Sequence, residues 1–150
     1  MHGRIIAASW EDENTEIGVE NFYNLCPSKF DYVSNMDKED SERSIKECFD
    51  RPGLKYNAKE RTLTIENKER YFTEKFKTFK TIVGKMSDVT LEDFSNGSRT
   101  EIYQLMWEYD DEYGTYLYIN EEDLTTLDSF VRIYEDGDEI HIGNALDYHI

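Results

Sequence analysis

Residues 107–124, WEYDDEYGTYLYINEEDL, hold seven carboxylates and four tyrosines but no cation. Like charges at this spacing repel one another, so crowding them does not stabilise a folded chain. Carboxylates of this density can bind a cation, work in pairs as general acid and base, or present a negative surface to a basic partner. The ligand spacing and the surrounding charges distinguish these three kinds of chemistry.

Calcium is the first chemistry that acid-rich turns suggest. An EF-hand loop needs oxygen ligands at its positions 1, 3 and 5 before a glycine at position 6. Counting back from Gly114 places Tyr109 and Tyr113 at positions 1 and 5, and counting back from Gly137 places Arg132 at position 1. Neither turn has the required ligands, so we predict no dedicated metal site.

The histidines are spaced without the HxH or HExxH patterns that bind zinc. His141 shares a predicted strand with Glu139, and Arg132 is expected opposite, so we interpret it as part of a cross-strand polar pair. Zinc held by His141, His149 and Asp147 would use suitable residue types, but their spacing does not indicate such a site.

Enzymatic motifs are absent from the sequence. It contains no GxSxG, GxGxxG or GxxxxGK[ST], and with 33 acids in the chain pairs of carboxylates arise by chance. Cys26 and Cys48 form no CxxC motif, and no charges around Cys26 would activate it as a nucleophile, so we expect reduced structural thiols. We therefore predict a protein that is not an enzyme and needs no cofactor.

The net charge of −16 is distributed unevenly along the chain. Residues 1–50 carry 5 Lys and Arg against 12 Asp and Glu, residues 51–85 carry 10 against 4, and residues 86–150 carry 2 against 17. This balance argues against binding to nucleic acid or to anionic membranes, both of which require a basic surface. It favours a basic protein as the partner, or a solvated surface with no partner.

The length and composition favour one folded domain that spans residues 1–150. Hydrophobic residues make up 38% of the chain and aromatic residues 14%, which is too rich for a disordered acidic tail. The apolar run near the N-terminus is too short for a signal peptide, and no run approaches the roughly twenty apolar residues of a membrane span. We expect a cytoplasmic protein.

Several elements are predicted from periodicity and from helix-stop signals. A buried first strand is expected at 4–10, and a second strand at 61–66 with residues 55–56 as its hairpin partner. A helix at 41–49 should end before Pro52 and Gly53.

The clearest predicted helix covers residues 68–86, with Asn67 as its N-cap. Apolar residues recur on one face at helical spacing, and we expect this stripe to pack into the core. The lysines beside the stripe are expected to be solvated or paired with acids of the N-terminal segment. The stripe comprises Phe72, Phe76, Phe79, Val83 and Met86, and the lysines are Lys75, Lys77, Lys80 and Lys85.

Two hairpins are predicted in the C-terminal third. The first pairs residues 102–109 with 113–119, which would turn Glu108, Tyr116 and Tyr118 away from the core. The second pairs 130–135 with 138–142 through a type I′ turn at Asp136-Gly137, with Val131 opposite Ile142 and Ile133 opposite Ile140. Between the hairpins, Glu121, Glu122 and Asp123 are expected to begin a short helix whose Leu124 and Leu127 face inward.

The predicted fold class is therefore α+β. We expect a single domain with a mainly antiparallel β-sheet built from hairpins and packed against the amphipathic helix (68–86) and shorter helices. The expected core comprises Ile5, Ile6, Trp10, Phe72, Phe76, Phe79, Val83, Leu105, Trp107, Leu117, Ile133 and Ile140.

The functional hypothesis is a non-catalytic acidic protein inhibitor that blocks a basic partner, first of all an immunity protein that neutralises a nuclease toxin. Carboxylates can occupy a cationic cleft in place of phosphates, and tyrosines are frequent interface anchors. The alternatives are a phage or plasmid DNA mimic that inhibits restriction or CRISPR machinery, and an acidic adaptor or housekeeping domain. The predicted partner-binding residues are Glu108, Asp110, Asp111, Glu112, Tyr113, Tyr116, Tyr118, Glu121, Glu122, Asp123, Asp136, Asp138 and Glu139.

Overall fold

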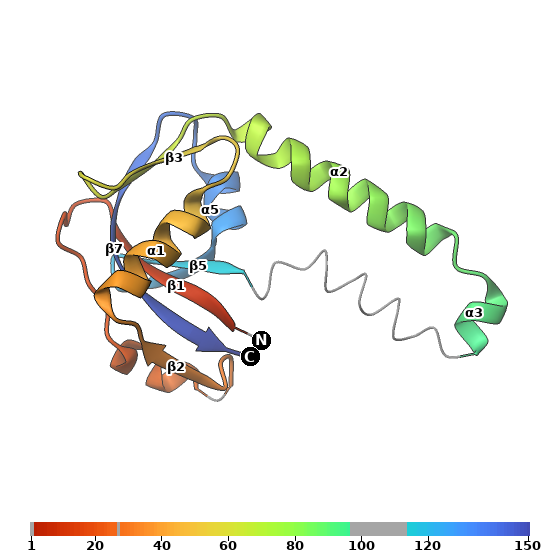
Figure 1. Cartoon of the computed structure of the whole chain (residues 1–150), viewed down its shortest axis with the longest axis horizontal. Helices are drawn as coiled ribbons and strands as arrows, with labels where there is room; N and C mark the ends of the chain where they lie inside the picture. The colour runs from red at the N-terminus through yellow and green to blue at the C-terminus, as the bar shows by residue number, and fades with distance from the viewer. Residues whose placement is uncertain (1, 27, 97–113) are drawn as a thin grey trace.

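A curled, mixed sheet of seven strands forms the centre of the protein in a computed structural model that describes residues 2–26, 28–96 and 114–150 (Figure 1). The strand order is β3-β4-β7-β1-β5-β6, and β2 also pairs with β7. The strands are β1 (His2–Ser9), β2 (Tyr32–Asn35), β3 (Leu54–Asn57), β4 (Thr62–Ile65), β5 (Thr115–Ile119), β6 (Asp123–Thr126) and β7 (Glu139–His149).

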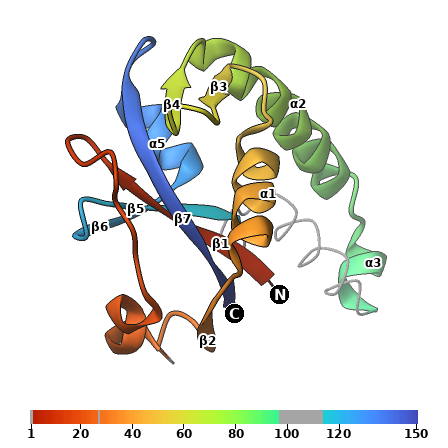
Figure 2. The same ribbon diagram turned by 60° about the vertical axis from the view of Figure 1, so that its left-hand side comes forward.

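The long strand β7 holds the sheet together. It pairs antiparallel with β1 along one edge, from the pair His2↔His149 to the pair Ser9↔His141. On its other edge β4 pairs with its first residues and β2 with its last residues, both antiparallel. One C-terminal strand thus joins three strands from the first half of the chain, and the sheet curls into a half-barrel around it (Figure 2).

Strand β1 is buried on both faces of the sheet. Ile6 and Ala8 contribute to one core cluster, whereas Ile5 and Ala7 contribute to the other. On the edge away from β7, β1 pairs with β5 in parallel, which is the exception in a sheet whose other pairings are antiparallel. A strand covered on both sides reads as a continuous apolar run, which is how the sequence predicted it.

Helices cover the two faces of the sheet. Helix α1 (Lys38–Phe49) buries Ile45 and Phe49 in the first cluster, and α5 (Leu127–Ile133) buries Leu127, Phe130 and Val131 there. The 3-10 helix η1 (Val19–Leu25) lies at the second cluster, where Phe22 is buried. Helix α2 (Lys68–Ser87) leads away from the sheet to the short helix α3 (Leu91–Ser95) (Figure 1).

The single α+β domain with a mainly antiparallel sheet is confirmed, as are several elements. Strands β3 and β4 form the expected antiparallel pair, α1 ends at Phe49 just before Pro52, and α2 begins after its N-cap Asn67, whose side chain accepts from the Arg70 N–H. In the core, Ile5, Ile6, Leu117 and Ile140 are fully buried, while Trp10 is partly buried against the first cluster.

The second predicted hairpin is wrong. Residues 127–133 form helix α5, and the Asp136-Gly137 turn connects this helix to β7. Ile140 lies opposite Leu63, and Ile142 opposite Ala8, instead of opposite Ile133 and Val131. Ile133 is 66% exposed, so its placement in the core is also wrong. The burial of Leu127, Phe130 and Val131 follows the i, i+3, i+4 spacing of a helix.

The expected helix start at Glu121 is wrong as well. Residues 120–122 form a turn and Asp123 begins β6, which pairs antiparallel with β5. The following helix starts at Leu127, after Thr126 caps it by accepting from the Ser129 N–H. Residues 102–109, together with Leu105 and Trp107 of the predicted core, lie outside the described residues.

The expected burial of the α2 stripe is largely wrong. Phe76 is 61% exposed, Val83 39% and Met86 37%, whereas Phe72 and Phe79 are partly buried. The residues of α2 that are buried are Tyr71 and Ile82, which lie toward one margin of the apolar face. The predicted helix is confirmed, but α2 extends beyond the sheet. In the described part of the chain, Phe76, Val83 and Met86 of this face are therefore exposed.

Candidate functional site

The turn between β5 and β6 carries three exposed acids, Glu121, Glu122 and Asp123. It closes with the Glu122 N–H donating to the Ile119 carbonyl, at 3.0 Å, and the antiparallel pair continues from Ile119↔Asp123. The hydroxyl of Tyr118 donates to the carbonyl of Glu121. These bonds hold the acidic turn in one conformation at the end of the sheet.

The loop after β1 carries three more exposed acids near its start, Glu11, Asp12 and Glu13. The hydroxyl of Ser9 accepts from the Glu11 and Asp12 N–H groups, at 3.3 and 2.9 Å, which folds the loop back at the strand end. The acids of this loop were not predicted as site residues. The sequence could have indicated these acids as site residues, because the three of them directly follow a predicted buried strand.

Hydrogen bonds join this loop to the β5–β6 turn. Because β1 and β5 are neighbouring parallel strands, their ends emerge side by side, about 4.8 Å apart. The Asn120 N–H donates to the Ala8 carbonyl at 2.9 Å, and the Trp10 N–H donates to the Asn120 side-chain oxygen at 3.2 Å. We call the six acids Glu11, Asp12, Glu13, Glu121, Glu122 and Asp123 the acidic end.

The carboxylates of the acidic end lack an ion-pair partner among the described residues, although Glu13 lines a pocket that Lys38 and Arg61 also line. Within the described ranges, no lysine, arginine or histidine forms an ion pair with any of its six carboxylates. Asp12 accepts from the Asn14 N–H, which is a local turn contact and not a neutralising one. The six charges therefore repel one another and attract external cations.

The backbone of the turn adopts an unusual conformation. Asn120 has φ 51° and Glu121 has φ 59°, in the left-handed region that glycine and asparagine occupy most readily. Asparagine adopts this conformation readily, but a glutamate with such a φ angle destabilises the folded state by about 1 kcal/mol or more. The pairing of β5 with β6 holds the strain in place.

The second predicted acidic cluster, residues 135–139, makes structural contacts. Asp136 accepts from the Lys68 N–H at 2.8 Å, at the start of α2. Asp138 accepts from the Glu135 N–H at 2.9 Å, and Glu139 accepts from the Thr64 hydroxyl at 3.0 Å. These carboxylates stabilise the turn before β7 and its junction with β4 and α2.

The predicted tyrosine anchors differ from one another in exposure. Tyr116 is 4% exposed and packs against Phe30 and Tyr148 in the second cluster, so the expectation that it points away from the core is wrong. Tyr118 is partly buried against Phe22 at a ring distance of 5.0 Å. The other predicted residues, Glu108, Asp110, Asp111, Glu112 and Tyr113, lie outside the described part of the chain.

A polar pocket of about 430 Å³ lies where the loop after β1 crosses β7. Gly143 allows this crossing, because a Cβ there would overlap the carbonyl oxygen of Thr15. Asn144 of β7 holds the loop against this strand through two hydrogen bonds with the backbone of Ile17, at 2.8 and 2.9 Å. The Arg61 guanidinium at the pocket edge donates to the carbonyls of Ile142 and Gly143, and its Nη1 lies 3.8 Å from a carboxylate oxygen of Glu42.

The histidines do not converge on a zinc site. His141 and His149 lie eight residues apart on β7, which is about 26 Å along an extended strand. His149 pairs with Asp31 and His2 pairs with Asp147, each at 2.9 Å. His141 lies between Ser9 and Thr62, so the expected opposition to Arg132 is wrong. Throughout the described residues, no group of three or more ligating side chains could hold a metal ion.

The two cysteines are free thiols, and both are partly buried. Burial raises the pKa of the Cys48 thiol, although a side-chain hydrogen bond with Thr115 acts in the opposite direction. A thiol that resists ionisation is a poor nucleophile. Cys48 therefore fits the structural role expected for it.

Comparison of the chain with known proteins supplies no relative, because no family model matches it and neither a curated protein nor a solved structure matches. A search of the described helices finds none that is both long and apolar enough to cross a membrane.

Proposed function

We propose that this chain is a non-catalytic acidic inhibitor that binds and blocks a basic protein through its acidic end. The observation that carries the proposal is that two neighbouring loops, distant in the sequence, expose six carboxylates with no ion-pair partner in the part of the chain that the structure describes. A surface of this kind steers a cationic partner toward it and makes association fast and salt-sensitive.

The conformation of Glu121 supports a role in binding. Strained backbone persists where the surrounding structure holds it, and such strain is frequent at functional sites. A glycine at this position would relieve the strain but would remove a carboxylate from the acidic end. A glutamate held at φ 59° is therefore consistent with selection for charge at this turn.

Among basic partners, we propose a nuclease toxin, so that the chain acts as an immunity protein. A nuclease binds phosphates in a cationic cleft, and a compact group of carboxylates can occupy the same positions. A DNA mimic that spans a long groove needs negative charge along its length. Here six cations lie on α2 against two acids, which favours a single compact contact over an extended one.

The test is capture of the partner followed by an activity assay. The immobilised protein is exposed to bacterial lysate at low salt, bound proteins are eluted at high salt, and the nuclease activity of the eluate is titrated with the free protein. We expect one basic nuclease whose activity falls to zero at a one-to-one ratio. A restriction or CRISPR complex in the eluate would favour the DNA mimic instead.

A charge-matched pair of variants locates the contact. Glu121→Gln/Glu122→Gln/Asp123→Asn removes three charges from the acidic end, and Glu39→Gln/Glu47→Gln/Glu60→Gln removes three exposed charges elsewhere. We expect the first variant to associate at least about tenfold more slowly at low salt, and the second to associate nearly as fast as the unchanged protein. Equal effects would contradict binding through the acidic end.

A further inference from the structure

Helices α2 and α3 form an arm, residues 68–95, that is anchored to the rest of the domain at its base. The Tyr71 hydroxyl donates to Asp128 at 2.6 Å, and the Lys75 ammonium pairs with the same carboxylate at 2.6 Å. The Arg132 guanidinium lies over the Phe72 ring, 5.3 Å from its centre. Beyond these contacts the arm extends away from the sheet (Figure 1).

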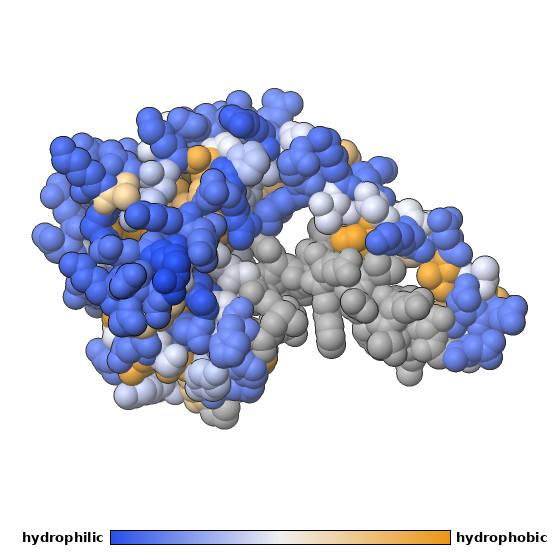
Figure 3. Space-filling view, viewed as in Figure 1, coloured by the Kyte–Doolittle hydropathy of each residue, from blue (hydrophilic) through white to orange (hydrophobic). Residues whose placement is uncertain are grey.

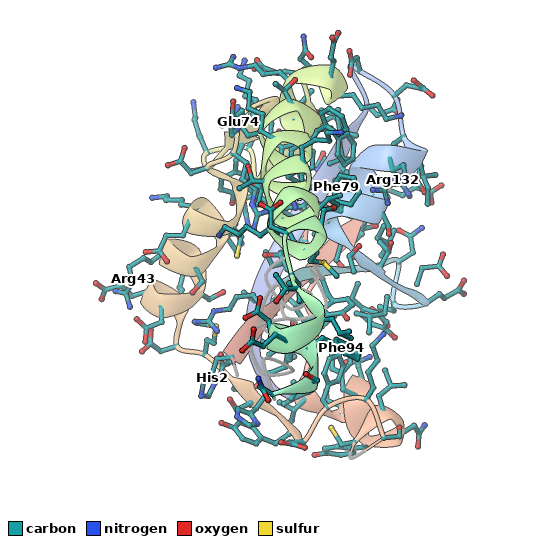
Figure 4. All side chains as sticks on the ribbon, turned by 90° about the vertical axis from the view of Figure 1, so that its right-hand side faces the viewer. His2, Arg43, Glu74, Phe79, Phe94 and Arg132 are labelled. Carbon is teal, nitrogen blue, oxygen red and sulfur yellow. The ribbon has the colours of Figure 1, made fainter. Side chains whose placement is uncertain are left out.

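The arm carries most of the exposed apolar surface of the described chain. Five of the eight large hydrophobic residues that are exposed belong to it, and Figure 3 shows hydrophobic residues at its surface. In Figure 4, Phe79 and Phe94 lie on one side of the arm and Glu74 on the other. Several exposed large apolar residues on one element are typical of a protein interface. The five residues are Phe76 (61% exposed), Val83 (39%), Met86 (37%), Leu91 (82%) and Phe94 (59%).

The charges of the arm change sign along its length. Helix α2 carries six cations and two acids, and its lysines continue to Lys85. The segment that follows carries three acids, Asp88, Glu92 and Asp93, and no cation up to Ser95. The arm therefore has a basic first part and an acidic tip, with exposed apolar side chains on both parts.

We propose that the arm pairs antiparallel with the arm of a second copy of this chain. A parallel pair would place lysines against lysines, whereas an antiparallel pair places the acidic tip of each copy against the basic part of the other. A two-fold axis near Val83 sets the acidic tip of one copy, which begins at Asp88, against the basic part of α2 of the other copy, which carries Lys77 and Lys80. The surface is self-complementary, as a two-fold interface requires.

The dimensions of the arm suit such an interface. A helix of 20 residues is about 30 Å long, and each copy contributes five exposed apolar side chains. A specific interface needs about 800 Å² from each partner, which long lysine side chains along the arm help to supply. The net charges of −16 repel each other, but charges beyond about 8 Å are screened at physiological salt.

The first test measures the oligomeric state of the full chain by sedimentation velocity over a wide range of concentrations. We expect a concentration-dependent dimer. Phe76→Ser and Leu91→Ser should each weaken it at least about tenfold, because every substitution acts twice in a two-fold interface. Tyr23→Ser, at a 67% exposed residue of η1, is the matched control and should leave the dimer unchanged.

The second test exchanges the charges. Lys77→Glu/Lys80→Glu and Asp88→Lys/Glu92→Lys should each be monomeric alone, and circular dichroism checks that both variants remain folded. Mixed together, they should form a heterodimer within about tenfold of the original affinity, because both contacts then join opposite charges, one of them with its signs reversed. A mixture that stays monomeric would overturn the antiparallel arrangement.

Two other outcomes would overturn the proposal as a whole. A chain that is monomeric at every concentration would mean that the apolar face of the arm is not an interface between copies and is open to another protein. A dimer that resists both Phe76→Ser and Leu91→Ser would mean that a different surface mediates association. Neither outcome affects the acidic end, which lies in other loops of the domain.

Discussion

The carboxylate of Asp128 helps to join the arm to the rest of the domain. It lies on α5 with its side chain 17% exposed, and it accepts from both Tyr71 and Lys75 of α2. A partly buried carboxylate needs such donors, because a charge without them loses solvation that nothing replaces. The Tyr71 ring also packs in the first core cluster, so this one side chain contacts both the core and Asp128.

Removing the Tyr71 hydroxyl should measurably weaken the fold. Tyr71→Phe keeps the ring in the core but removes a hydrogen bond to a charged group, and we expect a loss of about 1.5 kcal/mol in the free energy of unfolding. Urea unfolding followed by circular dichroism measures it. Tyr23→Phe, at an exposed tyrosine, is the control, and an equal loss in both variants would refute a specific role for the Asp128 contact.

Among the elements, the β5–β6 turn combines crowded negative charge with backbone strain. Asn120 and Glu121 both have positive φ, whereas Glu122 does not. The turn is closed by backbone hydrogen bonds and tied to β1 through Asn120, so the strain cannot relax without breaking these contacts. The two neighbouring glutamates of one turn therefore differ in backbone conformation while carrying the same charge.

Glycine should have opposite effects at these two glutamates. Glu121→Gly relieves a strained conformation and should raise the free energy of unfolding by up to about 1 kcal/mol. Glu122→Gly only increases the conformational entropy of the unfolded chain, so it should lower the free energy of unfolding by about 0.5–1 kcal/mol. Each variant removes one negative charge, so repulsion is relieved equally. Thermal and urea unfolding compare the pair, and equal changes would show that Glu121 is not strained.

At the scale of the whole molecule, negative charge opposes folding. A net charge of −16 on 150 residues produces self-repulsion in the compact state, and the six unpaired acids of the acidic end add to it locally. The ion pairs within the described residues are mostly at the surface, where each contributes little. Screening should therefore favour the folded state more than it weakens these pairs.

Sodium chloride at up to physiological concentration should raise the melting temperature by a few degrees. The measurement is thermal unfolding in the Leu91→Ser background, so that association through the arm does not contribute. Adding Glu121→Gln/Glu122→Gln/Asp123→Asn should reduce the salt dependence more than adding Glu39→Gln/Glu47→Gln/Glu60→Gln, because the first set lies in a crowded cluster. A melting temperature that falls with salt would mean that attractive pairs dominate.

Local patterns in the sequence determined the elements whose signals are short-range. The apolar run of β1 predicted a buried strand, and its burial on both faces agrees with that run. The period of α2 and its cap Asn67 predicted a helix with nearly the observed bounds, and Pro52 with Gly53 predicted the end of α1. Composition alone predicted a surface with excess negative charge.

Tertiary structure decided what lies beside and over these elements. Residues 130–133 are β-branched and aromatic enough for a strand, yet they form α5 because Thr126 caps a helix whose apolar residues meet the sheet. Periodicity identifies the apolar face of a helix but not what covers it, and α2 extends past the sheet with Phe76 exposed. The acidic end depends on the parallel pairing of β1 with β5, which joins segments more than one hundred residues apart through hydrogen bonds that no local pattern encodes.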